Sequence, residues 1–218
     1  MAILIRRRQR EAFSGLVDQL HKLRHRVFVE RLKWSLPRGD GVHEIDQFDS
    51  CDCLHLVVVD AFGRVRATSR VTPSLSPNVS CDLLAGEMGV TFPRGPDIAE
   101  VSRLCVDPDL DEGERADALL ELRVAQVELF ARHGWKRSIG VAYERTLQVW
   151  IRSGMTVEIL GPPIKFPGDR HFAYAAVASE DPNRPDGVMA FLGARSGALQ
   201  DPEQDPSLLA RFGRRATA

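Results

Sequence analysis

Long apolar runs are missing from this 218-residue chain. No stretch approaches the roughly 20 apolar residues that a membrane-spanning helix needs, so no membrane span is expected. The N-terminus also lacks the order of an export signal, because its arginines, Arg6 to Arg8, follow a very short apolar stretch instead of preceding a long one. We therefore expect a cytoplasmic protein.

Cysteine is scarce, and its pattern does not suggest a metal site. The chain has four cysteines, Cys51, Cys53, Cys81 and Cys105. Without an export signal they should be reduced thiols. Cys51 and Cys53 lack the matching second pair of a zinc site. His21 and His25 have ligand spacing, but no Glu follows His21 as a metalloprotease helix requires. No metal is expected.

An excess of one charge sign is also missing. The formal net charge is -1, so the composition does not call for nucleic acid or an anionic membrane as a partner. No internal repeat and no long Gly/Ser linker divides the chain. Its composition turns polar only from about Arg195. We expect one domain over residues 1–194 and a loosely held polar tail over 195–218, with a short helix at 208–212.

The apolar periodicity predicts alternating helices and strands. Helices are expected from Phe13 to near Trp34, before Pro37, and over 116–131 and 144–153; strands are expected over 3–5, 54–59, 65–71, 79–84, 98–106, 138–142, 157–160 and 172–178. The turn at residues 60–63 makes a hairpin of the strands around it. This order predicts an α/β fold with a mixed, mostly antiparallel sheet flanked by helices. An N-acetyltransferase-like (GNAT-like) fold fits it.

Charged residues occur where the secondary structure does not need them. Arg24 lies in the apolar stripe of the first helix, and the loop over 35–53 is acidic. Glu100 and Arg103 interrupt an otherwise apolar strand, and Arg70 ends another. Each charge has a simple alternative explanation as a solvated side chain, a surface ion pair or an Arg whose stem packs while its head reaches water.

Taken together, these residues resemble a known family signature. The pattern is Arg24-x3-Phe28-x5-Trp34, then Glu44-x-Asp46-x-Phe48-Asp49, then Arg70, then Glu100-x-Ser102-Arg103. It resembles the acyl-homoserine-lactone synthases, the LuxI-type autoinducer synthases, in residue type, order and spacing. The resemblance runs from about Leu20 to Val106 and continues more loosely to Gly154.

The resemblance implies a GNAT-like fold and an acyltransferase with two substrates. S-adenosylmethionine (SAM) supplies an amine, and an acyl-acyl carrier protein or acyl-coenzyme A supplies the acyl group. SAM is a substrate, so no cofactor is expected. The products are the acyl-homoserine lactone used in quorum sensing, methylthioadenosine and the free thiol carrier. The expected SAM-binding residues are Arg24, Phe28, Trp34, Asp46, Asp49 and Arg70.

The chemistry of these residues suits that reaction. Arginine pairs with carboxylates, aromatic rings pack on adenine or the sulfonium, and carboxylates pair with an ammonium group or with the arginines as a buried network. Our catalytic candidates are Glu100, Asp46 and Arg103, with Glu100 as the base that deprotonates the ammonium. By strand alternation Glu100 and Arg103 point to opposite faces, so they share a site only if a bulge intervenes.

Two departures from the family pattern border the expected acyl site. Leu104 stands where an aromatic residue is common, and residues 143–145 replace an expected Ser-Arg pattern. The expected acyl-pocket residues are Leu104, Gly140, Ala142, Leu147 and Trp150, and the acyl group is expected to be unusual, for instance branched or aromatic. The long helix also lacks the Gly-rich phosphate cradle of acetyl-coenzyme A users, which favours a carrier-protein donor. A carrier protein is acidic, so the surface that binds it should be basic. The candidates for this basic dock are Arg132, Lys136, Arg137, Arg145 and Arg152.

Two other functions stay open at this point. A generic acyltransferase of the same fold would acylate another amine without SAM. A non-catalytic module would bind the carrier protein without turnover, although a binder needs no buried set of charges. A DNA-binding regulator is disfavoured by the near-zero net charge.

Overall fold

The computed structural model describes residues 1–34, 40–180, 187–193 and 195–213. One eight-stranded sheet has the order β6-β7-β5-β4-β3-β2-β1-β8. Its strands are β1 (Ala2–Ile5), β2 (Leu54–Val59), β3 (Val65–Pro73), β4 (Ile98–Val106), β5 (Arg137–Tyr143), β6 (Met155–Ile159), β7 (Ala173–Glu180) and β8 (Leu199–Gln200). Five of the seven neighbouring pairs are antiparallel, and only β1–β8 and β4–β5 are parallel. The expected mixed, mostly antiparallel sheet is confirmed.

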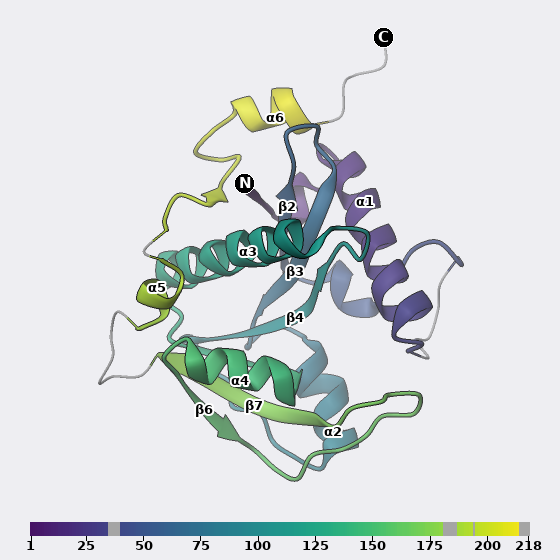
Figure 1. The fold of residues 1–218 in the computed structure, drawn as a ribbon, viewed down its shortest axis with the longest axis vertical. Helices are drawn as coiled ribbons and strands as arrows, with labels where there is room; N and C mark the ends of the chain where they lie inside the picture. The colour runs from purple at the N-terminus through teal and green to yellow at the C-terminus, as the bar shows by residue number, and fades with distance from the viewer. Residues whose placement is uncertain (35–39, 181–186, 194, 214–218) are drawn as a thin grey trace.

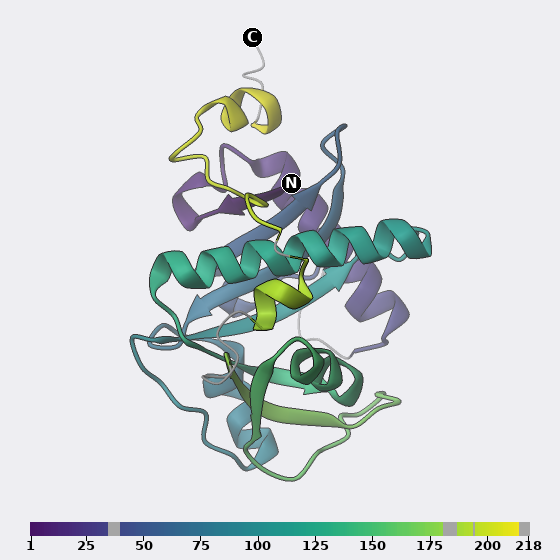
Figure 2. The same ribbon diagram turned by 60° about the vertical axis from the view of Figure 1, so that its left-hand side comes forward.

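Helices cover both faces of this sheet (Figures 1 and 2). They are η1 (Arg7–Gln9), α1 (Ser14–Arg24), η2 (His25–Arg31), η3 (Gln47–Ser50), η4 (Ser80–Leu84), α2 (Ala85–Met88), α3 (Glu112–His133), α4 (Glu144–Arg152), α5 (Gly187–Phe191) and α6 (Ser207–Phe212). Helix α3 packs on one face through Leu122 and Leu129, and α1 packs on the other through Leu16 and Leu20. None of the helices in the described ranges combines the length and apolar character that crossing a bilayer requires.

Strands β4 and β5 diverge along their length. Their parallel pairing joins 98–100 to 137–139, whereas β4 runs on to Val106 and β5 to Tyr143. A Cβ at Gly140 would lie 2.9 Å from the Val101 carbonyl oxygen, so glycine lets the two backbones approach at the point where the pairing ends. Beyond Glu100 and Ile139 the two strands are therefore no longer paired.

The first long helix changes its winding halfway. Helix α1 continues into η2, which has π-helical hydrogen bonding, and the turn ends at Arg31 instead of running to Trp34 as expected. Lys33 then takes a left-handed backbone conformation with φ 60°, and the Trp34 amide donates to the Phe28 carbonyl at 2.9 Å. The chain therefore folds back, and Trp34 lies over the helix it has just left. Pro37 and the rest of 35–39 lie outside the described residues.

The expected strand over 79–84 is wrong, because residues 80–84 form η4, which continues into α2. Asn78 acts as the cap that the sequence analysis overlooked: its side-chain oxygen accepts from the Cys81 amide at 3.0 Å. The Asp82 carboxylate accepts from the Asn78 amide at 2.8 Å. Side chains of this kind satisfy the free amides of a helical turn and override a short apolar run.

The C-terminal segment is held more firmly than expected. Strand β8 pairs with β1, and Asp201 beside it is 5% exposed. The Asp201 carboxylate accepts from Arg6 at 2.6 and 2.8 Å and from Arg132 at 2.7 Å. Helix α6 confirms the short helix predicted at 208–212. Strand β8 and Asp201 therefore attach the tail to the folded sheet, while the division of the chain at residue 194 stays a prediction.

Asp201→Asn should loosen this segment and change the response to acid. The Arg6 hydrogen bond is the largest cause that holds the pKa of Asp201 below its ordinary value. A carboxyl with a lowered pKa in the folded state stabilises the protein above its ordinary pKa, and that stabilisation is lost as the pH falls below about 4. We expect Asp201→Asn to cost about 1–3 kcal/mol at pH 7 and to flatten the stability curve below that pH.

The measurement is urea unfolding of the two proteins between pH 3 and 7. Glu203→Gln is the matched control, because Glu203 also contacts Arg6 and Arg8 but keeps 38% of its side chain exposed. It should change the free energy of unfolding by less than about 1 kcal/mol. If the two substitutions changed the free energy of unfolding equally, the burial of Asp201 would contribute nothing to stability.

Candidate active site

Arg70 connects β3 to the acidic loop. Its side chain is fully buried, not solvent-facing. Its guanidinium donates to the Asp46 carboxylate at 2.6 and 3.0 Å and to Asp49 Oδ1 at 3.0 Å. The short helix η3 presents both acids, because Asp46 caps it by accepting from the Phe48 amide at 2.9 Å and Asp49 accepts from the Asp46 amide at 2.9 Å. The loop is thus ordered here by its own carboxylates.

Arg24 binds the same loop from the helix side. It is 1% exposed, and its Nη1 and Nη2 donate to the two oxygens of Asp49 at 2.8 and 2.9 Å. Its Nε donates to Glu44, which is itself 3% exposed. A planar guanidinium suits this paired geometry, and Lys would not reproduce it. The charge in the apolar stripe is therefore the centre of an ion-pair network and not a snorkelling side chain.

Arg103 joins the network because β4 contains the bulge that the sequence analysis required. Arg70 pairs with Ser102 and Thr68 with Cys105, so β4 carries one residue more than β3 over this span. Arg103 occupies the extra position with φ 53°, a left-handed conformation that costs energy for a residue other than glycine. It donates to Glu44 at 3.1 Å and to Asp46 at 2.7 Å. Arg103 and Glu100 consequently lie on one face of the sheet.

The three arginines and three carboxylates balance in charge. Burial would raise the pKa of Asp49, but the charges of Arg24 and Arg70 hold it well below its ordinary value. Burial would likewise lower the pKa of Arg24, and Asp49 and Glu44 raise it instead. All three guanidinium groups therefore already have carboxylate partners, so the network forms a fixed side of the site and offers few unpaired charges. Its most exposed members are Asp46 at 17% and Arg103 at 10% of their side chains.

Glu100 lies beside this network on β4 and is 0% exposed. Its Oε1 accepts from the backbone amide of Ser80 at 2.6 Å, and its Oε2 accepts from the Ser102 hydroxyl at 3.1 Å. The same hydroxyl accepts from Arg70 Nε at 3.2 Å. A line of hydrogen bonds thus connects Glu100 through Ser102 to the arginine network. The start of η4 covers the other side of the carboxylate.

Two stacked aromatic rings extend the site toward the end of β5. Phe28 and Trp34 stack with centroids 4.7 Å apart, and Arg103 Cζ lies 5.9 Å from the centre of the Phe28 ring. Trp34 Nε1 donates to Asp169 Oδ1 at 2.9 Å and contacts Tyr143 Oη at 3.2 Å. Burial, reinforced by Asp169, raises the pKa of Tyr143 to about 12, so this hydroxyl stays protonated and donates to Asp169. The rings thus lie between Arg103 on β4 and Tyr143 on β5.

One group of potential metal ligands lies within the described residues. Asp49, Cys53 and His55 are buried with ligand atoms within 4.8 Å of one another. Asp49 is already held by Arg24 and Arg70, and these two guanidinium groups would repel a cation. We therefore treat this group as part of the ion-pair network.

A cavity of about 590 Å³ opens on the opposite face of the sheet, under α3, α4 and α5. Its wall is largely apolar: Val101, Val127, Phe130, Trp135, Val149 and Met155 among others. Of the expected acyl-pocket residues, Trp150 lines it. Leu104 packs in the core beneath α3 instead, Leu147 is buried on α4, and Gly140 and Ala142 lie on β5. The cavity touches Val101, where β4 and β5 separate.

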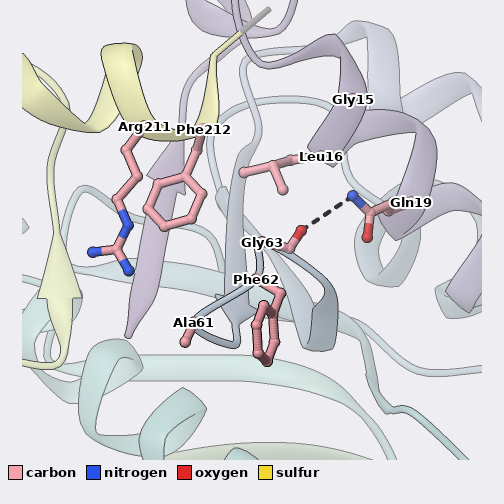
Figure 3. Close-up of a pocket in the computed structure, with 8 residues that line it drawn as sticks. All are labelled: Gly15, Leu16, Gln19, Ala61, Phe62, Gly63, Arg211 and Phe212. Carbon is pink, nitrogen blue, oxygen red and sulfur yellow. Dashed lines mark hydrogen bonds between the residues drawn. The ribbon is translucent and has the colours of Figure 1, made fainter.

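A second hollow of about 240 Å³ lies at the tip of the β2–β3 hairpin (Figure 3). Its lining is Gly15, Leu16, Gln19, Ala61, Phe62, Gly63, Arg211 and Phe212. Gln19 Nε2 donates to the Gly63 carbonyl at 3.2 Å, and this bond fastens the hairpin to α1. The hollow is shallow and contains none of the residues of the ion-pair network.

The structure also identifies site residues that the sequence analysis did not select. Ser80 was hidden in a segment expected to be a strand, and Asp169 lies in a loop without a pattern. Tyr143 was noticed only as a departure from the family. Glu44 was part of the matched pattern but was not chosen as a site residue, although it contacts both Arg24 and Arg103.

Comparison with known proteins identifies the family of this chain. The model of the family described as autoinducer synthase matches residues 8–184. An acyl-homoserine-lactone synthase of Ralstonia solanacearum is 31% identical over 154 residues, which cover 68% of this chain and 76% of that protein. The CoA-dependent acyl-homoserine lactone synthase BjaI, solved with MTA (methylthioadenosine), is 25% identical with a TM-score of 0.80 over 97% of this chain and 98% of its own.

More distant structures share the fold alone. An acyl-CoA N-acyltransferase from Pseudomonas aeruginosa is 14% identical, with a TM-score of 0.50 over 82% of this chain and 99% of that one. The expected GNAT-like fold is therefore confirmed. Because the family model covers most of its length and a curated relative exceeds 30% identity over two thirds of it, this chain belongs to the autoinducer synthases, the family of acyltransferases that comprises the acyl-homoserine-lactone synthases.

Proposed function

We propose that this chain acylates the amine of SAM from an acyl thioester at the network beside Glu100, and that the product then closes to an acyl-homoserine lactone for quorum sensing. The observation that carries the proposal is the convergence of Arg24, Arg70 and Arg103 with three carboxylates where β4 and β5 diverge. SAM is treated as a substrate, and no further cofactor is needed. The cytoplasm remains the expected location.

The proposed SAM contacts follow from exposure. Asp46 and Arg103 are the network members that keep accessible surface, so Asp46 is placed near the substrate ammonium and Arg103 near its carboxylate. Arg24, Arg70 and Asp49 hold these two in position. Trp34 and Phe28 offer an aromatic edge for the adenine or the sulfonium. Asp46, Arg103 and the two aromatic rings are therefore assigned to contact SAM, and the other members of the network to support them.

Amide formation needs a neutral amine. Glu100 accepts a proton from the ammonium, either directly or through the Ser102 hydroxyl that already donates to it. The amine nitrogen then attacks the thioester carbon, forming the C–N bond. The C–S bond breaks, and the carrier thiolate takes up a proton. A backbone amide of the bulged segment at Ser102–Leu104 is our candidate for stabilising the oxyanion.

Lactone formation follows within the acylated molecule. A carboxylate oxygen attacks the carbon next to the sulfonium, a C–O bond forms, and the C–S⁺ bond breaks to release neutral methylthioadenosine. Closing a five-membered ring within one molecule depends mainly on orientation, and the rigid network supplies it.

The acyl chain is proposed to enter the cavity under α3 and α4 through the gap between β4 and β5. The acyl donor is an acyl-acyl carrier protein or an acyl-coenzyme A. The first turn of α3 carries Glu112 and Glu114, which oppose a pyrophosphate and favour a carrier protein. Arg132 and Arg137 of the proposed basic dock are already paired with Asp201 and Asp97. A carrier protein would therefore compete with these two ion pairs.

The test is mass spectrometry of purified protein supplied with SAM and a panel of acyl-carrier-protein and acyl-coenzyme A thioesters. The expected result is a lactone that appears together with methylthioadenosine, and its mass gives the acyl group. Intact SAM with every donor, accompanied by acylation of another amine, would show a generic acyltransferase instead.

A further inference from the structure

Arg123 is the one arginine that α3 places in the wall of the large cavity. Its surroundings are unusual for a charged side chain. Among the described residues, no carboxylate oxygen lies within 4.0 Å of the Arg123 guanidinium, the distance that defines an ion pair. The one hydrogen bond that Arg123 forms there runs from its Nη1 to Gln126 Oε1 at 3.3 Å. Burial alone lowers the pKa of Arg123 to about 10. A guanidinium has five N–H donors, so most of its hydrogen-bonding capacity is unused.

Trp150 adds a second unused donor to the same wall. It lines the cavity from α4, and its Nε1 is a buried donor with no hydrogen-bond partner among the described residues. Arg123 Cζ lies 6.0 Å from the centre of the Trp150 ring, so the two donors belong to one region of the cavity. A buried donor without an acceptor, such as Trp150 Nε1, costs free energy, and proteins rarely keep one without a use. Arg123 is half-buried beside it and has further N–H groups to offer.

Gln126 does not supply the missing acceptor. Its side-chain oxygen already receives Arg123, and its Nε2 donates to the Ser69 hydroxyl at 3.0 Å. These two hydrogen bonds fix the orientation of the Gln126 side-chain amide. Gln126 therefore offers Arg123 only the oxygen that already accepts from Nη1. Most of the remaining wall is apolar, with Val188 of α5 and Leu192 just after it, and α5 lies below α3 (Figure 2). The charged residues that also line the cavity are Asp97, Lys136, Arg137 and Glu180. Neither carboxylate forms an ion pair with Arg123. The cavity therefore combines an apolar wall with a local excess of donors.

We infer that the acyl group accepted by this protein carries an oxygen acceptor at its distal end, which Arg123 and Trp150 bind inside the cavity. The inference rests on the proposed function, because it assigns the cavity to the acyl chain. A terminal carboxylate matches both the charge and the donors of the guanidinium. A phenolic hydroxyl matches the donors and suits an aromatic acyl chain. A plain alkyl chain leaves both donors unpaired.

The test compares coenzyme A thioesters in matched pairs that differ only in the distal oxygen. One pair is hexanoyl and adipoyl, and the other is cinnamoyl and 4-hydroxycinnamoyl. Lactone formation from SAM is measured for each. A hydrogen bond to a charged group is worth about 1.5–3 kcal/mol, so at least one oxygenated donor should exceed its partner in kcat/KM by about 10- to 100-fold.

Arg123→Met should remove or reverse that preference, measured as the ratio of kcat/KM between the two members of each pair. The substitution fits the largely apolar wall, and replacing a half-buried charge that has no ion-pair partner among the described residues should leave the melting temperature equal or higher. Arg64→Met is the matched control, since Arg64 lies on the β2–β3 hairpin with 66% of its side chain exposed. It should leave the preference unchanged.

Three results would overturn the inference. A preference for the plain donor in both pairs would show that the cavity selects alkyl chains. An unchanged preference after Arg123→Met would show that Arg123 does not bind the distal oxygen of the acyl group. An equal loss for both members of each pair would indicate that Arg123 binds a phosphate of the carrier. Absence of lactone from every donor is a failure of the proposed function, and calorimetric binding of the same thioesters without SAM then decides the preference separately.

Discussion

Replacing Arg24 with Met is expected to cost about 3–5 kcal/mol of folding free energy. Among the described residues, Arg24 is the one cation that contacts both Glu44 and Asp49. Its loss leaves these two carboxylates, 3% and 5% exposed, with one arginine partner each. Breaking a buried pair by removing one partner is costly because the remaining charge stays desolvated. Since small domains are stable by only about 5–15 kcal/mol, this loss is a large part of the total.

Urea unfolding followed by circular dichroism measures the loss. Lys22→Met is the matched control, because Lys22 is on the same helix, pairs with Asp18 at 2.8 Å and is 48% exposed. It should change the free energy of unfolding by less than about 1 kcal/mol. A comparable effect of both substitutions would mean that water reaches the network and that its burial is unimportant.

A double substitution separates charge balance from packing. Arg24→Met with Asp49→Asn leaves Arg70 and Arg103 facing Asp46 and Glu44, so the remaining charges balance again. The double variant should therefore recover part of the stability lost in Arg24→Met, a coupling that a double-mutant cycle measures. Recovery of stability without recovery of activity would assign the network a positioning role beyond its contribution to folding.

The sequence could predict the network but not the backbone that assembles it. Arg24 and Arg70 can be recognised because a charge within an apolar pattern is costly unless it is paired. Asp46 can be recognised because it belongs to the family pattern. The π-helical winding of η2 and the left-handed conformation of Arg103 have no local signal, since neither glycine nor asparagine marks them. Only the ion pairs of Arg103 with Glu44 and Asp46 explain why its backbone tolerates the bulge.

The acyl side was harder to predict for a different reason. The expected residues were chosen by closeness in sequence to family positions. Trp150 lines the cavity, whereas Leu104 is partly buried against the core and Leu147 is buried on α4. Their role in acyl binding stays a prediction. A signal for Arg123 did exist, because it lies three residues after Leu120 and four before Val127 within the apolar stripe of α3. A charge within a stripe was recognised on α1 and overlooked on α3, where no family motif drew attention to it.

Glu100→Gln is expected to lower kcat for acyl transfer by about 100- to 10,000-fold at pH 7, the range typical of removing a general base. The amide keeps an oxygen that can accept from the Ser80 amide, so the fold and the KM for SAM should change little. Glu87→Gln on the exposed side of α2 is the matched control and should leave kcat unchanged.

The pH dependence distinguishes a base from a structural group. An α-amino group has a pKa near 8, so the substrate amine becomes neutral without help as the pH rises from 7 to 9. If Glu100 accepts the proton, the deficit of Glu100→Gln should shrink over that range, whereas a structural role predicts a constant deficit. Ser102→Ala then identifies the route. A loss as large as that of Glu100→Gln indicates transfer through the hydroxyl that donates to Glu100, and a small loss indicates direct transfer or water.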